Sequence, residues 1–145
     1  MKILVSACLL GCACRYDGCS KADDRVLSLT AHHTFIPVCP EQLGGLPTPR
    51  LPAECQGNCI TRKDGQDVTK EYTKGGHEAL RLYQLLQCDA AILKARSPSC
   101  GKSIIYDGTF SGTLTEGNGV TAALFLQNGI PVYTEDEANL LQGGD

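Results

Sequence analysis

Four short apolar runs alternate with helical patterns along this chain, and that alternation limits the possible folds more than any other feature. The runs cover residues 3–7, 35–38, 90–93 and 130–133, and helical spacing occurs at 21–32, 70–87, 120–127 and 135–142. Nearly continuous apolar runs of this length are typical of strands buried on both faces of a parallel sheet. The pattern predicts one α/β domain over residues 1–145, a Rossmann-like three-layer sandwich with a mainly parallel sheet flanked by helices.

Local signals refine this prediction. Pro37 lies in the second run and cannot donate to a sheet ladder, which favours an edge position or a distorted start for that strand. Gly75 and Gly76 interrupt the 70–87 helical pattern, which indicates a close approach by another backbone or a ligand, or a later helix start.

Two segments do not fit the alternation. Residues 40–66 are rich in glycine and proline and are expected to form a long loop, and a loop of that length inside a compact domain is usually functional. Residues 103–118 are expected to form a small inserted hairpin, with Asp107 and Gly108 as its turn.

Composition excludes several classes of protein. No apolar run approaches the ~18 residues of a membrane span, and the apolar stretch near Met1 is too short for a secretory signal. We therefore expect a cytoplasmic protein without a membrane partner. Thirteen basic and 16 acidic residues give a net charge of −3, which argues against bulk binding of duplex nucleic acid. A local basic pocket for one nucleotide remains compatible with this charge.

The chain has nine cysteines in 145 residues, an odd number that cannot pair completely within one chain. Disulfides are not the default in a reducing cytosol, so ligands for a metal or cluster, reactive thiols and small buried side chains are the alternatives. Burial accounts for one or two cysteines easily and for nine poorly.

Three of these cysteines follow predicted strands. Cys8 and Cys39 stand at the ends of the first and second strands, and Cys100 lies on the loop after the third. Because ligands bind beyond the carboxyl ends of strands in open α/β sheets, these three thiols are expected to share one edge. Three adjacent thiolates need a neutralising cation. A catalytic zinc with an open position and a four-iron cluster with one iron not held by cysteine both fit.

Other candidate residues lie near the same edge. Glu41 follows Cys39 by two positions, so its carboxylate is a candidate general base or covalent participant. Ser97 and Ser99 flank Pro98 and could reach a substrate or only stabilise a turn. Lys94 and Arg50 could bind anionic or carbonyl groups, although basic residues more often face water.

The six remaining cysteines have no firm role. The spacings Cys8-x3-Cys12 and Cys55-x3-Cys59 suit a four-thiolate structural zinc, which would compete for Cys8. Ordinary free thiols are the simpler interpretation for Cys12, Cys19, Cys55, Cys59 and Cys88. Cys14 stands two residues before Tyr16-Asp17-Gly18 and is a candidate to line the site.

The motifs over nearly the whole chain, in the same order, resemble the TudS-type thiouracil desulfidases, a small bacterial family long known as a domain of unknown function. The segments that carry the resemblance are Ser6-Ala7-Cys8-Leu9-Leu10-Gly11, Cys14-Arg15-Tyr16-Asp17-Gly18, Val38-Cys39-Pro40-Glu41, Gly44-Gly45-Leu46, Pro49-Arg50, Pro52-Ala53-Glu54, Asp67-Val68-Thr69, Ser97-Pro98-Ser99-Cys100-Gly101, Tyr106-Asp107-Gly108-Thr109-Phe110-Ser111-Gly112 and Gly119-Val120-Thr121-Ala122-Ala123. The chain departs from the expected pattern at Cys12, Ala13, Cys55 and Cys59.

The resemblance implies a [4Fe-4S] cluster held by Cys8, Cys39 and Cys100, with zinc or another ion in its place, or an empty site, after aerobic handling. It also implies non-redox removal of sulfur from thiouracil-like bases: the thiocarbonyl sulfur binds the open iron, and water or Glu41 attacks the carbon. Ser97, Ser99 and Lys94 are then candidates for proton delivery and orientation. The expected partner is a small thiobase or thionucleoside, with folded RNA less favoured.

Two alternatives use the same thiolates. One is a zinc-dependent hydrolase, although the chain lacks the His-x-Glu signature of zinc deaminases. The other is a non-enzymatic module that carries a metal or cluster, which leaves Glu41 and the serine-rich loop without a role.

Overall fold

The computed structural model describes residues 1–142 and is built around a four-stranded parallel sheet. Its strands are β1 (Lys2–Ser6), β2 (Thr34–Val38), β5 (Ala90–Ile92) and β8 (Val132–Tyr133), in the order β2-β1-β5-β8. All three neighbouring pairs are parallel. The four predicted strands are therefore confirmed, and β2, which contains Pro37, lies at an edge of the sheet as expected.

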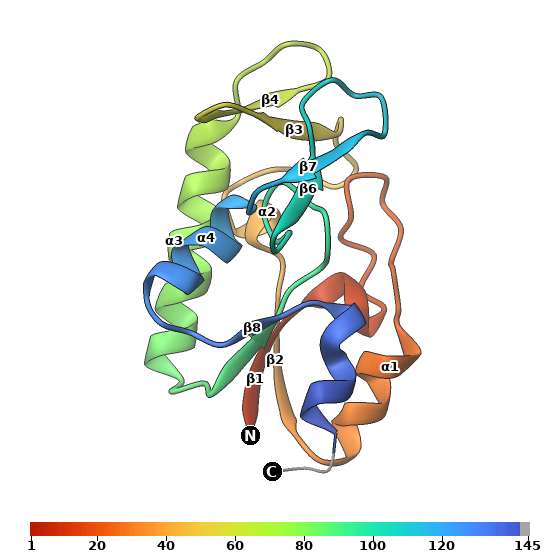
Figure 1. Cartoon of the computed structure of the whole chain (residues 1–145), viewed down its shortest axis with the longest axis vertical. Helices are drawn as coiled ribbons and strands as arrows, with labels where there is room; N and C mark the ends of the chain where they lie inside the picture. The colour runs from red at the N-terminus through yellow and green to blue at the C-terminus, as the bar shows by residue number, and fades with distance from the viewer. Residues whose placement is uncertain (143–145) are drawn as a thin grey trace.

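Helices cover both faces of this sheet (Figure 1). On one face, Leu4 of β1 belongs to a core with residues of α3 (Thr69–Leu85) and α4 (Val120–Gln127). On the other face, Ile3 and Val5 pack with residues of α1 (Asp24–Leu27) and of the 3-10 helices η1 (Ala7–Leu10), η2 (Ser28–Ala31) and η3 (Glu135–Leu141). Successive side chains of β1 thus enter different cores, and the predicted three-layer sandwich is confirmed.

The two longest helices match their sequence patterns, but the other two differ. The 21–32 pattern is divided between α1 and η2, and the 135–142 pattern forms the 3-10 helix η3. The Asp23 side chain accepts the N–H groups of Arg25 and Val26, so α1 begins at Asp24. Further on, the Ser28 hydroxyl donates to the Arg25 carbonyl, and such local side-chain bonds compete with a regular helix.

The expectation of a long loop over residues 40–66 is wrong in part. This segment contains the short helix α2 (Pro40–Leu43) and a hairpin of β3 (Ala53–Gln56) and β4 (Cys59–Arg62). Gly57 has a positive φ of 64° in the turn between the two strands. The hairpin escaped prediction because only Ala53 and Ile60 of its strand residues are buried, so it lacks a strong apolar pattern.

The second hairpin is confirmed, but its turn is not the predicted one. Strands β6 (Ile104–Tyr106) and β7 (Leu114–Glu116) pair antiparallel and are joined by residues 107–113 rather than by a two-residue turn. The Glu54 carboxylate of β3 accepts the N–H groups of Gly108 and Phe110, which holds this connection against the first hairpin. Both hairpins lie beyond the carboxyl ends of the parallel strands (Figure 1).

Helices α2 and α3 touch backbone to backbone, as a glycine-mediated approach predicts. A Cβ on Gly75 would lie 1.8 Å from the Pro40 carbonyl oxygen, and one on Gly44 would lie 1.9 Å from the Glu71 carbonyl oxygen. Only glycine fits at these two positions. The contact fixes α2, which follows Cys39, against the long helix α3.

Over residues 1–142, the helices are too short or too polar to span a lipid bilayer.

Candidate active site

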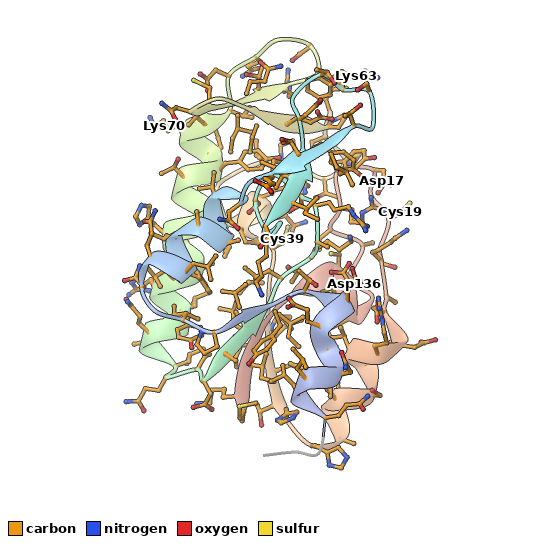
Figure 2. All side chains as sticks on the ribbon, in the orientation of Figure 1. Asp17, Cys19, Cys39, Lys63, Lys70 and Asp136 are labelled. Atoms are coloured by element: carbon orange, nitrogen blue, oxygen red, sulfur yellow. The ribbon has the colours of Figure 1, made fainter. Side chains whose placement is uncertain are left out.

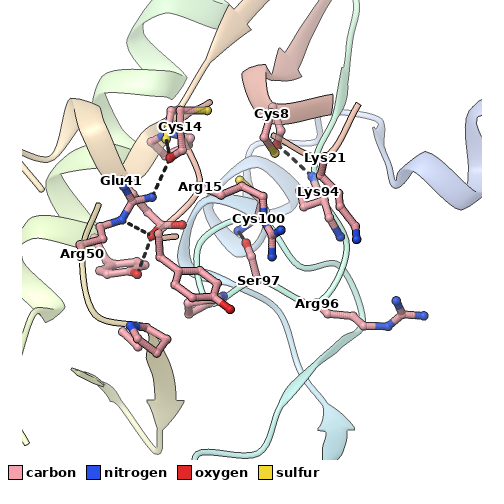
Figure 3. Close-up of a pocket in the computed structure, with 18 of the residues that line it drawn as sticks. Cys8, Cys14, Arg15, Lys21, Glu41, Arg50, Lys94, Arg96, Ser97 and Cys100 are labelled. Carbon is pink, nitrogen blue, oxygen red and sulfur yellow. Dashed lines mark hydrogen bonds and ion pairs between the residues drawn. The ribbon is translucent and has the colours of Figure 1, made fainter. Parts of the chain in front are cut away.

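A cavity of about 490 Å³ opens at the carboxyl ends of the parallel strands, and residues of both hairpins also line it. Its walls come from the segments that follow β1, β2 and β5 and from the hairpins (Figure 3). The polar or reactive side chains that line it are Ser6, Cys8, Cys14, Arg15, Tyr16, Lys21, Cys39, Glu41, Arg50, Glu54, Lys63, Tyr72, Lys94, Arg96, Ser97, Cys100 and Tyr106.

The three strand-end cysteines all line this cavity. Cys8 is buried in η1 directly after β1, half-buried Cys39 separates β2 from α2, and buried Cys100 follows β5 by a short loop. Figure 2 shows Cys39 near the centre of the molecule, with Cys19 at its outer edge. Three residues that are far apart in sequence therefore meet at one place, because parallel strands end at one edge of the sheet.

The loop that carries Cys100 is fixed by the start of α4. Backbone N–H groups of Val120 and Thr121 donate to the carbonyls of Pro98 and Ser99, at 3.0 and 2.8 Å. Gly119 allows this contact, since a Cβ there would lie 2.5 Å from the Ser99 carbonyl group. The Cys100 thiol is thus held by a rigid element although it lies on a loop.

Cys14 is a fourth thiol at the cavity. It is buried, and its thiol lies within hydrogen-bonding reach of the thiols of Cys39 and Cys8. The Cys39 Sγ atom also lies 3.7 Å from the Cys14 carbonyl oxygen. The hydrogen bond with Cys39 lowers the pKa of Cys14, but the one with Cys8, burial and the neighbouring thiols outweigh it and raise this pKa to about 11.

The thiols of Cys39 and Cys100 also stay protonated when no cation is near. The hydrogen bond with Cys14 and burial raise the pKa of Cys39, and burial raises the pKa of Cys100 to about 12. A bound cation would have to displace these protons, because thiolate is the form that binds metal.

Glu41 projects into the cavity from the first turn of α2. Its Oε1 atom accepts hydrogen bonds from Arg50 Nε at 3.1 Å and from the Tyr72 hydroxyl at 2.8 Å. The Glu41 side chain is 17% exposed, whereas that of Arg50 is only 4% exposed. A carboxylate bound in this way has one fixed orientation at the edge of the cavity (Figure 3).

The other predicted polar residues are placed differently. Ser97 lines the cavity, and its Oγ atom accepts the Cys100 N–H at 2.6 Å. Within residues 1–142 its hydroxyl hydrogen has no acceptor. Lys94 also lines the cavity, but its ammonium group pairs with Glu135 at 2.9 Å. Ser99 is 1% exposed, is absent from the cavity wall and bonds Thr121 at 3.0 Å. Ser99 thus lies behind the cavity wall, with its hydroxyl 3.8 Å from Cys100 Sγ, and its contact with a substrate stays a prediction.

The remaining cysteines lie elsewhere. Cys12, Cys19 and Cys59 are exposed. Cys59 pairs with Gln56 across the first hairpin, so Cys55, one position earlier, projects from the opposite face. Among residues 1–142, no three cysteine, histidine, aspartate or glutamate side chains are arranged to hold a single metal ion. The four-thiolate zinc site is thus not formed in this part of the chain.

Tyr72 was not predicted from the sequence, and Arg50 was predicted only as a possible binder of anionic or carbonyl groups. Tyr72 belongs to the buried face of α3, together with Gly75, Ala79 and Tyr83. The sequence pattern places the Tyr72 hydroxyl on the buried face of the helix. A buried tyrosine hydroxyl needs a hydrogen-bond partner, so this position could have indicated a polar contact. The identity of that partner depends on the α2–α3 contact, which no local pattern reveals.

The donor set fits an iron–sulfur cluster. Iron in such clusters is bound by cysteine thiolates, and a four-iron cluster is held at its corners, so its ligands surround a volume rather than one point. Here the thiols of Cys8, Cys39 and Cys100 come from three separate segments around a cavity of about 490 Å³. A single tetrahedral zinc would need its ligands gathered around one atom.

Comparison with known proteins agrees with this arrangement. Residues 3–137 match the family described as 2-thiouracil desulfurase. The chain belongs to the 2-thiouracil desulfurase family. This match includes every cysteine and every polar residue discussed above.

Two known proteins are similar to this chain over almost their full length. The solved structure of the [4Fe-4S]-dependent thiouracil desulfidase TudS is 46% identical, covers 97% of this chain and 94% of its own, and superposes with a TM-score of 0.91. The uncharacterized protein YbbK of Bacillus subtilis (strain 168) is 43% identical over 94% of this chain and 97% of its own. A solved structure with a stated activity thus shares the fold of this chain.

Proposed function

We propose that this protein is an iron–sulfur-dependent desulfidase that acts on 2-thiouracil-like bases. The observation that carries the proposal is the cavity at the sheet edge, where Cys8, Cys39 and Cys100 surround a space that also contains the Glu41 carboxylate. The family match and the similarity to TudS support the same activity. The net reaction exchanges sulfur for oxygen: the thiobase C=S and water give C=O and hydrogen sulfide, with no electrons gained or lost.

Cys8, Cys39 and Cys100 would hold the cluster as thiolates. When bound, a four-iron cluster with three cysteine ligands supplies one iron without a cysteine, a Lewis acid that polarises the C=S bond and receives its sulfur. Glu41 then either accepts a proton from the attacking water or attacks the carbon itself. The Ser97 hydroxyl hydrogen is free to donate to a polar atom of the base. Lys94 is held by Glu135 and would contribute positive charge to the wall.

The cavity suits a flat base. A volume of about 490 Å³ accommodates a pyrimidine with a substituent, and the rings of Tyr16, Tyr106 and Phe110 line the walls. Lys21, Lys63 and Arg96 also line it, and none makes an ion pair within residues 1–142. These cations could bind a phosphate group, so a thionucleotide is a candidate substrate in addition to the free thiobase.

A reducing compartment is consistent with this chemistry. All nine cysteines are free thiols, and thiolate ligands and iron–sulfur clusters are both damaged by oxidation. We therefore propose that the protein acts in the cytoplasm.

The proposal is tested by anaerobic reconstitution with iron and sulfide, followed by incubation with 2-thiouracil without any electron donor or acceptor. The expected result is a brown protein that releases uracil and sulfide in equal amounts. A brown protein that binds but does not convert thiobases would support a cluster carrier instead. A colourless protein that is activated by zinc alone would support the hydrolase alternative, and either result would contradict the proposed function.

A further inference from the structure

Arg50 and Tyr72 both donate to the same oxygen of Glu41, and this contact has a consequence for the proposed function. Arg50 Nε and the Tyr72 hydroxyl lie 3.1 and 2.8 Å from Glu41 Oε1. Within residues 1–142, no hydrogen bond is formed to Oε2. Arginine often binds both oxygens of a carboxylate with two parallel bonds, and here it binds only one.

Arg50 is held too firmly to follow a moving carboxylate. Its Nη1 atom donates to the Pro47 carbonyl and the Thr48 hydroxyl, each at 3.0 Å, and its Nη2 atom donates to the Cys14 carbonyl at 3.0 Å. Four of its five N–H donors are thus used, and its side chain is 4% exposed. The guanidinium connects α2, the segment before β3 and the Cys14 segment as one rigid unit.

Tyr72 is fixed from the other side. It is 3% exposed in the first turn of α3, and the contact between Gly75 and Pro40 locks α3 against α2. Burial, with repulsion from the Glu41 carboxylate, raises the pKa of Tyr72, so the hydroxyl keeps its proton and remains a donor. Two immobile donors therefore determine where the Glu41 carboxylate points.

We propose that Arg50 and Tyr72 are positioning residues that bind Glu41 Oε1 and leave Oε2 as the atom that acts on the substrate. The inference rests on the proposed function, because it concerns the carboxylate assigned to the attack. Donation from two groups makes Oε1 a poor acceptor for a further proton, whereas Oε2 keeps its lone pairs for the cavity. Reacting groups accelerate a reaction only when they are held in a productive orientation, which these two bonds provide.

The test is a cycle of variants in the reconstituted holoenzyme. Tyr72→Phe removes only the hydroxyl, and Tyr83→Phe is the matched control, because Tyr83 is a buried tyrosine on the same helix whose ring packs on Phe125. Tyr72→Phe is expected to lower kcat about tenfold, as for one hydrogen bond to a charged group, with unchanged KM and iron content. Tyr83→Phe should resemble the wild type.

The same substitution in a Glu41→Gln background separates positioning from a general structural effect. If Tyr72 acts through Glu41, Tyr72→Phe should lower the remaining rate by less than about twofold there. An equal loss in both backgrounds, or equal rates for Tyr72→Phe and Tyr83→Phe, would overturn the proposal. An inactive wild type with full cluster content would instead contradict the proposed function itself.

A crystal structure of metal-free Tyr72→Phe gives a readout that does not depend on activity. The Glu41 carboxylate should lose its single orientation and rotate into the cavity. A carboxylate that keeps the wild-type position would overturn the role of Tyr72.

Discussion

Cys39 and Glu41 are two residues apart, yet their side chains have different neighbours. Cys39 lies at the junction of β2 and α2, where its thiol faces Cys14 and the cavity. Glu41 is the second residue of α2, and its carboxylate accepts hydrogen bonds from Arg50 and Tyr72. The sequence could predict the cysteine because it ends an apolar run. The partners of Glu41 could not be predicted, because Tyr72 reaches it across 31 positions of the chain.

Replacement of Glu41 by glutamine tests this division of roles. Glutamine keeps the shape of the side chain but removes its charge and basicity, so the cluster should still assemble. Uracil release should fall at least about a hundredfold, the lower bound for loss of a general base. Anaerobic single-turnover assays with matched iron content measure this. Turnover near that of the wild type would remove Glu41 from the mechanism, and lost iron would show that it is structural.

At the level of elements, the site depends on how closely α2 approaches α3. The two glycines in the α3 pattern indicated a close approach, but the identity of the neighbour was beyond local sequence information. The neighbour, α2, lies in a segment whose glycines and prolines predicted only a loop. The β3–β4 hairpin escaped prediction for a related reason, since it is stabilised by a small separate core that includes Tyr72 and Val68 rather than by its own apolar pattern.

Substitution of the two adjacent glycines in α3 should separate packing from helix propensity. Gly75→Ala places a Cβ 1.8 Å from the Pro40 carbonyl oxygen, so α2 must move. We expect the free energy of unfolding to fall by about 2 kcal/mol or more, with reduced iron retention because Cys39 precedes α2.

Gly76→Ala is the matched control. Its Cβ would lie 3.2 Å from the Thr121 hydroxyl, a tight contact that a shift of a few tenths of an ångström relieves. A gain in helix propensity of about 1 kcal/mol should offset that contact. Urea unfolding of the metal-free variants gives both values, and similar stabilities for the two would refute the proposed α2–α3 constraint.

At the scale of the whole molecule, topology gathers the reactive residues. The alternation of strands and helices predicted a parallel sheet, and the carboxyl ends of β1, β2 and β5 lead directly to Cys8, Cys39 and Cys100. This edge could be predicted from the sequence because it follows from strand order alone. Cys14 was a candidate for this edge, and the second hairpin was predicted, but the approach of Cys14 to Cys39 and the place of both hairpins over the cavity depend on long-range contacts and could not be predicted. The net charge of −3 also conceals a local group of cations at the cavity.

Iron and sulfide content after anaerobic reconstitution shows whether the three strand-end thiols hold the cluster. Cys8→Ala, Cys39→Ala and Cys100→Ala should each lose the cluster, because two thiolates hold four irons poorly. Cys88→Ala and Cys19→Ala, which change thiols outside the cavity wall, should retain about four irons per chain. Full iron loading of Cys39→Ala would contradict the account.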